Sequence, residues 1–387
     1  MSSITNLFKN NLKQYSMIIA LVFIVVLFQI LTDGTLLKPL NITNLILQNS
    51  YILVLAIGMV LVIITGHIDL SVGSIAAFVG AISAILMVNL QMNPFLAVII
   101  CLLVGALIGA WQGFWVAYVG IPAFIVTLAG MLLFRGLTLV VLQGQSIAPY
   151  PTSFQQISNG FIPNIFGGEG LHVFSIIIGF ILSIILIVME IRTRKNQVKY
   201  QFDVLPQGLF VAKLVAIFAV INLFTYVLAT YRGIPNILII LFVLIVGYTF
   251  VMQKTIIGRH IYAVGGNLKA ASLSGVKTKQ VTFGVFVNMG VLSALSGLIF
   301  AARLNAATPR AGNLFELDAI AAVFIGGASA YGGVGTVIGA IVGGLVMGVM
   351  NNGMSILGLG IDWQQAIKGL VLLAAVAFDI INKKKSS

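Results

Sequence analysis

The sequence predicts an all-α, polytopic membrane protein of about ten transmembrane helices, with glycine-rich helices that are broken or re-entrant. Of its 387 residues, 60% are apolar and 8% are charged, whereas a soluble domain carries about 25% charged residues. Apolar runs of roughly the 20 residues that a membrane-crossing helix needs recur along the whole chain. No polar stretch between them is long enough to bury a core, so residues 1–387 are expected to form a single transmembrane domain.

The first apolar run follows a basic start, MSSITNLFKNNLKQ, as in a signal peptide. It continues to Leu31 without a small-x-small cleavage site, which predicts an uncleaved first span. The candidate spans, in chain order, are residues 16–32, 50–66, 70–89, 94–117, 123–142, 172–189, 209–229, 236–253, 283–302, 334–351 and 364–381.

Basic residues mark the ends that face the cytoplasm. Most of the 21 Lys and Arg residues stand beside apolar runs, in the N-terminal segment, the loops 190–208 and 254–282, and the tail Lys383–Lys385. The positive-inside rule places such clusters in the cytoplasm. The net charge of +12 is therefore a topology signal and not a nucleic-acid surface. The loop 143–171 falls outside, and the tail lies inside only if 319–333 also crosses or dips into the membrane.

Two glycine-rich interruptions stand between apolar runs, one in each half of the chain. The stretch AIAAVFIGGASAYGG at 319–333 covers only about 22 Å as a helix, which predicts a broken helix or re-entrant hairpin. The other is GHIDLSVGS at 66–74. Paired interruptions point to a transport pathway. YVGIP at 118–122 and YRGIP at 231–235 are either the trace of an inverted repeat or a chance match.

Four ionisable residues in or beside the spans each have a structural and a functional interpretation. Asp69 is expected to cap a helix that starts at Leu70, and it could also hold a broken helix that lines a pathway. Arg135 lies mid-span, at a cost of about 2.5–3.5 kcal/mol, and needs a carboxylate or carbonyl partner or else a wet pathway. Glu316 and Asp318 suit the positive end of the helix that follows; no histidine or nucleophile is near enough to make them a catalytic pair.

The sequence shows no enzyme or metal constellation. Cys101 is the only cysteine, which excludes an internal disulfide and a Cys-based metal cluster. His67, His172 and His260 stand apart at span edges, without the paired spacing of a zinc site. No G-x-x-x-x-G-K-[ST] phosphate loop occurs, so any ATP that drives the protein must be hydrolysed by another chain.

The basic loop 254–282 contains a predicted short helix. Asn267 is a good N-cap for LKAASLS, and Gly275 suits the left-handed position after the helix. So short a helix is not stable alone, so it must dock, either on lipid headgroups or on a protein.

Three segments resemble the permease subunits of ribose- and xylose-type bacterial monosaccharide ABC importers: GHIDLSVGS, GRHIYAVGGNLKAASLSGV and ELDAIAAVFIGGASAYGGVGTVIGAIVGG. The likeness extends over nearly the whole chain, and WQGFWVAYVGIPAFIV is similar to the multiple-monosaccharide subgroup. The resemblance implies a transport subunit of the bacterial inner membrane, with both termini cytoplasmic, that moves xylose or other pentoses and hexoses inward. An ion-coupled symporter is the main alternative, but it would need deep ionisable groups, and the acids are expected at span edges. A membrane enzyme is the second alternative.

The resemblance also implies partners and sites. The chain would bind no cofactor, form a homodimer, dock a cytoplasmic ATPase with two nucleotide-binding domains that uses ATP and Mg, and receive sugar from a periplasmic or lipid-anchored binding protein. Within the coupling loop 254–282, the ATPase contacts would be Gly265, Gly266, Asn267, Ala270, Ala271 and Gly275. Candidate pathway residues are Asp69 and Ser71 in the first interruption and asparagines that flank glycine-rich or apolar segments, namely Asn288, Asn305, Asn351 and Asn352.

Overall fold

The computed structural model describes residues 12–167, 170–202 and 204–386, and in these ranges the regular elements are helices. The predicted all-α class is thus confirmed. The helices are α2 (Leu12–Leu31), α3 (Pro39–Ile64), α4 (Val72–Ala84) with the π-helical η1 (Ile85–Asn89), α5 (Pro94–Phe114) with η2 (Trp115–Val119), α6 (Ala123–Leu142), α7 (Thr152–Asn159), α8 (Val173–Lys199), α9 (Gln207–Ala229), α10 (Asn236–Lys254), α11 (Ile256–Gly266), α12 (Leu268–Leu273), α13 (Thr278–Leu304), α14 (Phe315–Ile325), α15 (Val337–Ile356) and α16 (Ile361–Ser386).

Nine helical segments among the described residues are long and apolar enough to cross a membrane, and α2 adds a shorter apolar stretch, Met17–Leu31. The chain is a multi-pass membrane protein, as predicted. One boundary differs clearly: α3 begins at Pro39, not at residue 50. Proline at the first helical position favours that start. Polar residues hid the first turns of α3 in the sequence pattern. Their side chains form hydrogen bonds within the helix, since Thr43 Oγ1 donates to the Pro39 carbonyl and Asn49 Nδ2 to the Leu45 carbonyl.

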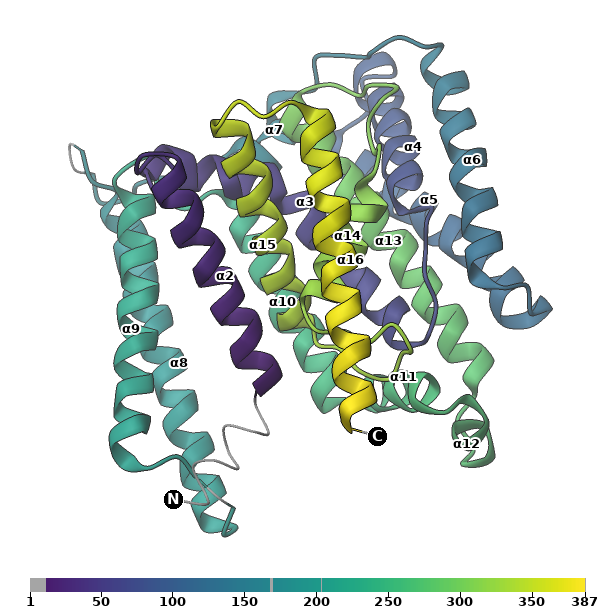
Figure 1. The fold of residues 1–387 in the computed structure, drawn as a ribbon. Coiled ribbons are helices and arrows are strands. Elements are labelled where there is room, and N and C mark those ends of the chain that lie inside the picture. Colours follow the sequence, from purple (N-terminus) through teal and green to yellow (C-terminus); the bar gives the residue numbers. More distant parts are fainter. Residues whose placement is uncertain (1–11, 168–169, 203, 387) are drawn as a thin grey trace.

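The long helices run side by side, and the short helices α7, α11 and α12 lie at their ends (Figure 1). The helices α11 and α12 lie on the face where α16 ends, and α7 lies on the opposite face. The broken element reaches the first of these faces. Helix α14 stops at Ile325, and the non-helical residues 326–336 continue until the Gly333 N–H donates to the Ile64 carbonyl, 2.8 Å away, at the end of α3. The predicted break at 319–333 is confirmed.

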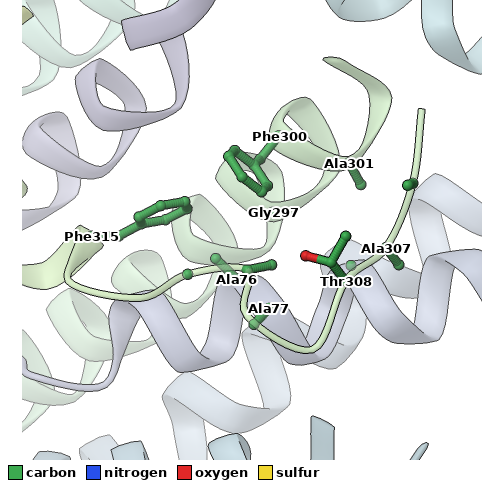
Figure 2. A pocket seen from close by; sticks show the side chains of 12 residues that line it. Ala76, Ala77, Gly297, Phe300, Ala301, Ala307, Thr308 and Phe315 are labelled. Atoms are coloured by element: carbon green, nitrogen blue, oxygen red, sulfur yellow. The ribbon is translucent and has the colours of Figure 1, made fainter. Parts of the chain in front are cut away.

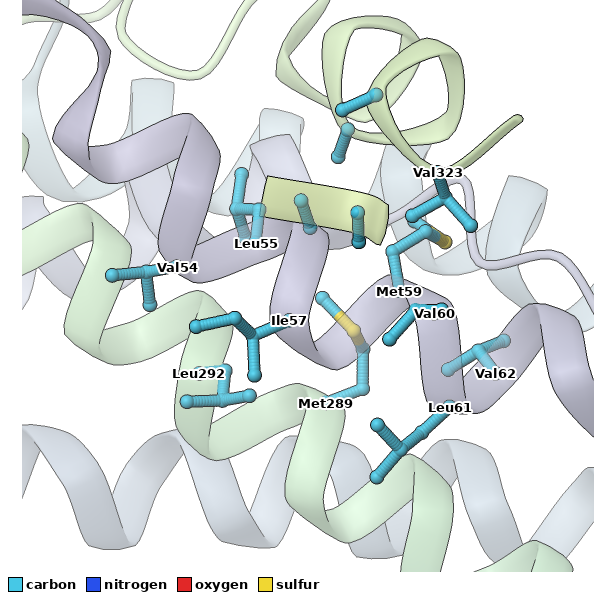
Figure 3. Close-up of a cluster of buried hydrophobic side chains, with 14 of the residues drawn as sticks. Val54, Leu55, Ile57, Met59, Val60, Leu61, Val62, Met289, Leu292 and Val323 are labelled. Carbon is cyan, nitrogen blue, oxygen red and sulfur yellow. The ribbon is translucent and has the colours of Figure 1, made fainter. Parts of the chain in front are cut away.

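Helix α3 forms the centre of the bundle. Its residues from Val54 to Val62 are buried and lie against Met289 and Leu292 of α13 and Val323 of α14 (Figure 3). Around this centre, glycines let helix backbones touch. A Cβ on Gly105 of α5 would lie 2.5 Å from the carbonyl oxygen of Gly290 in α13. Such close contacts between small residues are typical of packing in lipid, where the hydrophobic effect does not drive helices together.

The two similar pentapeptides form the same local turn. Gly120 and Gly233 have φ of +87° and +86°, and Pro122 and Pro235 each take the N-cap position of the next helix. The two turns lie at opposite ends of the bundle (Figure 1). An inverted internal repeat stays a prediction.

Candidate functional site

The predicted short helix of the loop 254–282 is present as α12. The Asn267 side chain accepts a hydrogen bond from the Ala270 N–H at 2.9 Å. Gly275 has φ +86°, and the Val276 N–H donates to the Ala271 carbonyl at 3.0 Å, which closes the helix in the usual glycine-dependent way. Both predicted caps are confirmed.

The six predicted coupling residues differ in exposure, and Gly265 is half-buried. Gly266, Asn267, Ala270 and Gly275 are exposed. Ala271 is only 5% exposed and packs into its own chain, and its predicted contact with the ATPase stays a prediction. No sequence pattern singles out the residue that dominates the outer side of α12. Leu273 is 90% exposed, the largest exposure among the exposed large apolar side chains of the described residues.

Helix α11 also went unrecognised within the loop. Its buried residues Gly258, Ile261 and Val264 stand three apart, the spacing of one helix face, so that spacing could have revealed it. The Thr255 side chain accepts a hydrogen bond from the Gly258 N–H at the start of the helix. The loop is therefore two successive helices, α11 and α12, and α11 carries α12.

Three distant segments meet at a point that we call the glycine junction, defined by Ile64, Gly265, Gly332 and Gly333. A Cβ on Gly265 would lie only 1.6 Å from the Ile64 carbonyl oxygen and 2.8 Å from the Gly333 nitrogen. Gly332 and Gly333 have φ of +79° and +72°, which favours glycine at both positions. The Tyr262 hydroxyl of α11 also donates to the Gly335 carbonyl at 2.7 Å. The coupling loop is thereby attached to the end of α3 and to the break before α15.

The first interruption is held by a buried polar network. Asp69 Oδ1 accepts from the Ser71 N–H at 2.8 Å and from the Ser71 hydroxyl at 2.6 Å, and Gln112 Nε2 donates to that hydroxyl at 2.8 Å. Asp69 is 1% exposed. The carboxylate accepts a backbone N–H as predicted, but α4 begins at Val72 rather than Leu70, because Asp69 closes a turn before the helix instead of capping it.

Arg135 of α6 has the internal partner that its position requires. Its two terminal nitrogens donate to the carbonyls of Ala311, at 3.2 Å, and Gly312, at 3.3 Å. Gly312 in turn lies against the start of α4, since a Cβ on it would be 1.9 Å from the Gly73 carbonyl oxygen. Arg135 therefore fixes the segment before α14 against the first interruption.

The acids at the start of α14 are more deeply buried than expected. Glu316 is 5% exposed and Asp318 is 8% exposed. Asp318 accepts from Lys368 of α16 at 3.0 and 3.2 Å, a pair that the sequence analysis missed although Lys368 interrupts an apolar run. The acids were expected at span edges. Glu316 and Asp318 do lie in the first turn of α14, but both are buried, which was not expected. Glu316 Oε2 and Asp69 Oδ2 have no partner among the described residues.

Two of the predicted asparagines have clear structural roles. Asn305 ends α13 with φ +55° and accepts from the Tyr150 N–H at 2.8 Å. Asn352 and Asn41 exchange two hydrogen bonds, of 2.7 and 3.1 Å.

The other two asparagines each have an unpartnered atom. The Asn351 side-chain oxygen is buried without a partner in the described chain, as is Asn288 Nδ2, although Asn288 Oδ1 accepts from the Tyr248 hydroxyl. The six predicted pathway residues thus do not form one site. Asp69 contacts Ser71, whereas Asn288 and Asn305 lie far apart on α13. Their pathway role stays a prediction.

Two cavities lie near these elements. The first, of about 10 Å³, is enclosed by α4, α13 and residues 306–315, with Phe300, Phe315 and Thr308 among its lining (Figure 2). It has room for about one water molecule. The second, of about 650 Å³, lies between α3, α10, α11 and α13 and is lined by both Asn288 and Gly275. No group of three or more His, Cys, Asp or Glu side chains that could hold a metal ion occurs in the described ranges.

Comparison with known proteins gives consistent matches. Residues 41–376 match the family described as "Branched-chain amino acid transport system / permease component". The xylose transport system permease protein XylH of Haemophilus influenzae is 42% identical over 97% of this chain and 98% of its own length. XylH of Escherichia coli K12 is 40% identical over 97% and 94%, and the ribose import permease protein RbsC of Bacillus subtilis is 35% identical over 94% and 91%. No solved structure gives a significant match.

Proposed function

This chain belongs to the branched-chain amino acid transport system permease family, and from that premise we propose that it carries monosaccharides into the cell as the membrane subunit of an ATP-binding-cassette importer. Membership makes it a transport subunit rather than an enzyme. The observation that carries the cargo assignment is 42% identity, over almost the full length of both chains, to a xylose transport permease. We propose xylose first, and other pentoses and hexoses as alternatives.

The expected partners follow from the surface of the coupling loop and from the importer class. The exposed Leu273, with Leu268 at 56% exposure, offers a small apolar contact to a protein on the face of α11 and α12. We propose that a cytoplasmic ATPase docks there and hydrolyses ATP with Mg, because this sequence has no phosphate-binding loop of its own. A sugar-binding protein on the opposite face, a homodimer, an inner-membrane location and cytoplasmic termini complete the proposal.

In the proposed mechanism, the glycine junction passes a displacement of the coupling loop to the membrane helices. When the ATPase domains close on ATP they displace α12, and α11 moves with it. Because Gly265 is in backbone contact with Ile64 and Gly333, this displacement reaches the end of α3 and the break before α15 together. The bundle then exchanges between two packed arrangements that open on opposite sides.

Roles for the predicted pathway residues remain part of the proposal. Asp69 and Ser71 are proposed to hold the start of α4 at the edge of the pathway, which their mutual hydrogen bonds support. Asn288 is the asparagine that lines a cavity large enough for a sugar. Asn351 and Asn352 lie at the end of α15.

Uptake in reconstituted vesicles tests the function. Proteoliposomes that contain this chain, its ATPase and its binding protein should accumulate D-xylose only with ATP, and ionophores that collapse proton and sodium gradients should not stop them. Accumulation by this chain alone, driven by an ion gradient, would instead establish the symporter.

Gly275→Val tests the coupling loop. Valine is strained at φ +86°, so the chain after α12 should be misdirected while membrane insertion and dimerisation proceed. We expect transport to be lost, and the ATPase either to dissociate or to hydrolyse ATP without sugar movement. Ser274→Ala, at an exposed neighbour, is the control. Normal coupling in Gly275→Val would remove this loop from the mechanism.

A further inference from the structure

The cavity of about 650 Å³ enters the proposal above only through Asn288, as a candidate pathway residue, and the mechanism gives it no regulatory role. Leu61 of α3 and Ile261 of α11 form part of its wall, and α10 and α13 form its sides. Its volume lies within the range of roughly 300–1,000 Å³ that small-molecule sites occupy. Its exposed lining residues include Gly275 and Lys277, which follow α12, and Gln280 in the first turn of α13. The cavity is therefore open toward the coupling face.

The cavity lining is polar at Asn288 and Tyr248, which contact each other. Asn288 lies ten residues into α13, about 15 Å along the helix from its start. The Tyr248 hydroxyl donates to Asn288 Oδ1, so the amide oxygen is used and the Nδ2 donor is left buried and unpartnered. A buried amide without a partner costs about 1–3 kcal/mol. A ligand that brings a hydrogen-bond acceptor to this depth would remove that cost.

A groove between α8 and α9 provides a comparison, because its lining suits lipid. It measures about 580 Å³ and is lined mainly by aliphatic side chains such as Leu186, Ile217 and Val220. Its one charged residue, Glu190, is already paired with Lys213. Acyl chains can fill that groove without leaving a polar group unsatisfied. They cannot do so beside Asn288, because hydrocarbon offers no hydrogen-bond acceptor.

We propose that the cavity between α10 and α13 binds the transported monosaccharide from the side to which it is released, and that this binding inhibits the transporter. The inference rests on the proposed function. A sugar offers hydroxyl oxygens to Asn288 Nδ2 and further hydrogen bonds to Gln280 and His260, and its C–H faces suit the aliphatic wall of Val281 and Val285. Both α11 and the first half of α13, which flank α12, line the cavity. A bound sugar would hold them together and oppose displacement of α12.

The test measures product inhibition and binding in the same preparation. The complete complex in nanodiscs, without binding protein, should bind D-xylose by isothermal titration calorimetry. In proteoliposomes, D-xylose loaded on the coupling-loop side should reduce the ATPase rate severalfold. Asn288→Leu removes the donor, and the isosteric Asn288→Asp replaces it with an acceptor. Each should weaken binding about tenfold or more and relieve the inhibition, expressed relative to the rate of the same variant without internal sugar.

Controls keep the outcomes distinct. Gln253→Leu alters an exposed amide of α10 outside the cavity and should bind D-xylose like the unchanged protein. Size-exclusion profiles identify variants that fail to fold, and Asn288→Asp, the closest in shape, decides the case if Asn288→Leu does not fold.

ATP-driven uptake that proceeds without any binding or inhibition by D-xylose would overturn this inference alone. Loss of ATP-driven uptake in the unchanged complex would overturn the proposed function. Binding of xylose phosphate but not of xylose would overturn the sugar assignment and indicate an anion site at Lys277.

Discussion

Helices α3 and α9 have the same mean hydropathy and opposite environments. In the most apolar 18 residues of each, 83% are buried in α3 and 11% in α9. Hydropathy therefore predicts that a segment crosses the membrane and not where it stands in the bundle. We attribute the difference in burial to the small residues through which neighbouring helices contact α3.

The surroundings of α3 show how small residues create the core. A Cβ on Gly344 of α15 would lie 2.6 Å from the Leu53 side chain, and one on Gly348 would lie 2.8 Å from that of Asn49. Helix α9 packs mainly on α8, where Gly179 faces Thr225. Helices α8 and α9 pack mainly on each other, whereas α3 has neighbours on all sides. Substitutions in the core should therefore cost much more than equivalent substitutions at the edge.

The largest effect is expected at the glycine junction. In Gly265→Ala the new methyl group would meet backbone atoms of Ile64 and Gly333, which cannot rotate away. The loss should exceed the roughly 1–3 kcal/mol of an ordinary overpacked side chain. We expect little folded protein, measured as monodisperse yield in detergent. Gly266→Ala, one residue on, meets nothing within 4 Å and should leave the yield unchanged. Equal yields from both variants would mean that the junction is not tightly packed.

Two Lys–carboxylate ion pairs among the described residues allow the same chemistry to be compared in both regions. Lys368 and Asp318 expose 23% and 12% of their side chains, whereas Lys213 and Glu190, between α8 and α9, expose 43% and 34%. Removing one partner of a buried pair costs about 3–5 kcal/mol, and an exposed pair contributes about 0–1 kcal/mol. Lys368→Met should thus lower the thermal midpoint clearly, and Lys213→Met should hardly change it. A similar shift in both would refute the distinction.

A smaller effect is expected at Arg135. Arg135→Leu leaves the carbonyls of Ala311 and Gly312 without their donor, at about 1–3 kcal/mol. The abundance of folded protein should fall while the preference among sugars stays the same, measured by competition during uptake. Normal abundance together with an altered preference would place Arg135 on the pathway.

Much of this architecture could be predicted because it depends on local signals. Apolar run length predicted the spans, the glycines of 319–333 predicted the break after α14, and Asn267 and Gly275 predicted the ends of α12.

The remaining features depend on contacts between segments that are distant in the sequence. Hydrophobic periodicity does not reveal such contacts. Asp318 and Lys368 are 50 residues apart, and each looks like an edge residue until α14 and α16 are placed together. The inward position of Ala271 and the partners of the asparagines depend in the same way on neighbouring helices. The glycine junction also needed the structure, because the sequence shows its glycines in separate motifs without their contact.

The central claim is that the coupling loop and the break before α15 move as one unit, joined by the glycine junction. Double electron–electron resonance tests it most directly, with spin labels on α12 (Ser272→Cys), in the break (Val334→Cys) and on α8 (Arg192→Cys), in a Cys101→Ala background diluted with unlabelled chains. Between the nucleotide-free and ATP-bound complexes, the distance from 272 to 334 should stay the same and the distance from 272 to 192 should change. A change in the first distance with a constant second would contradict the account.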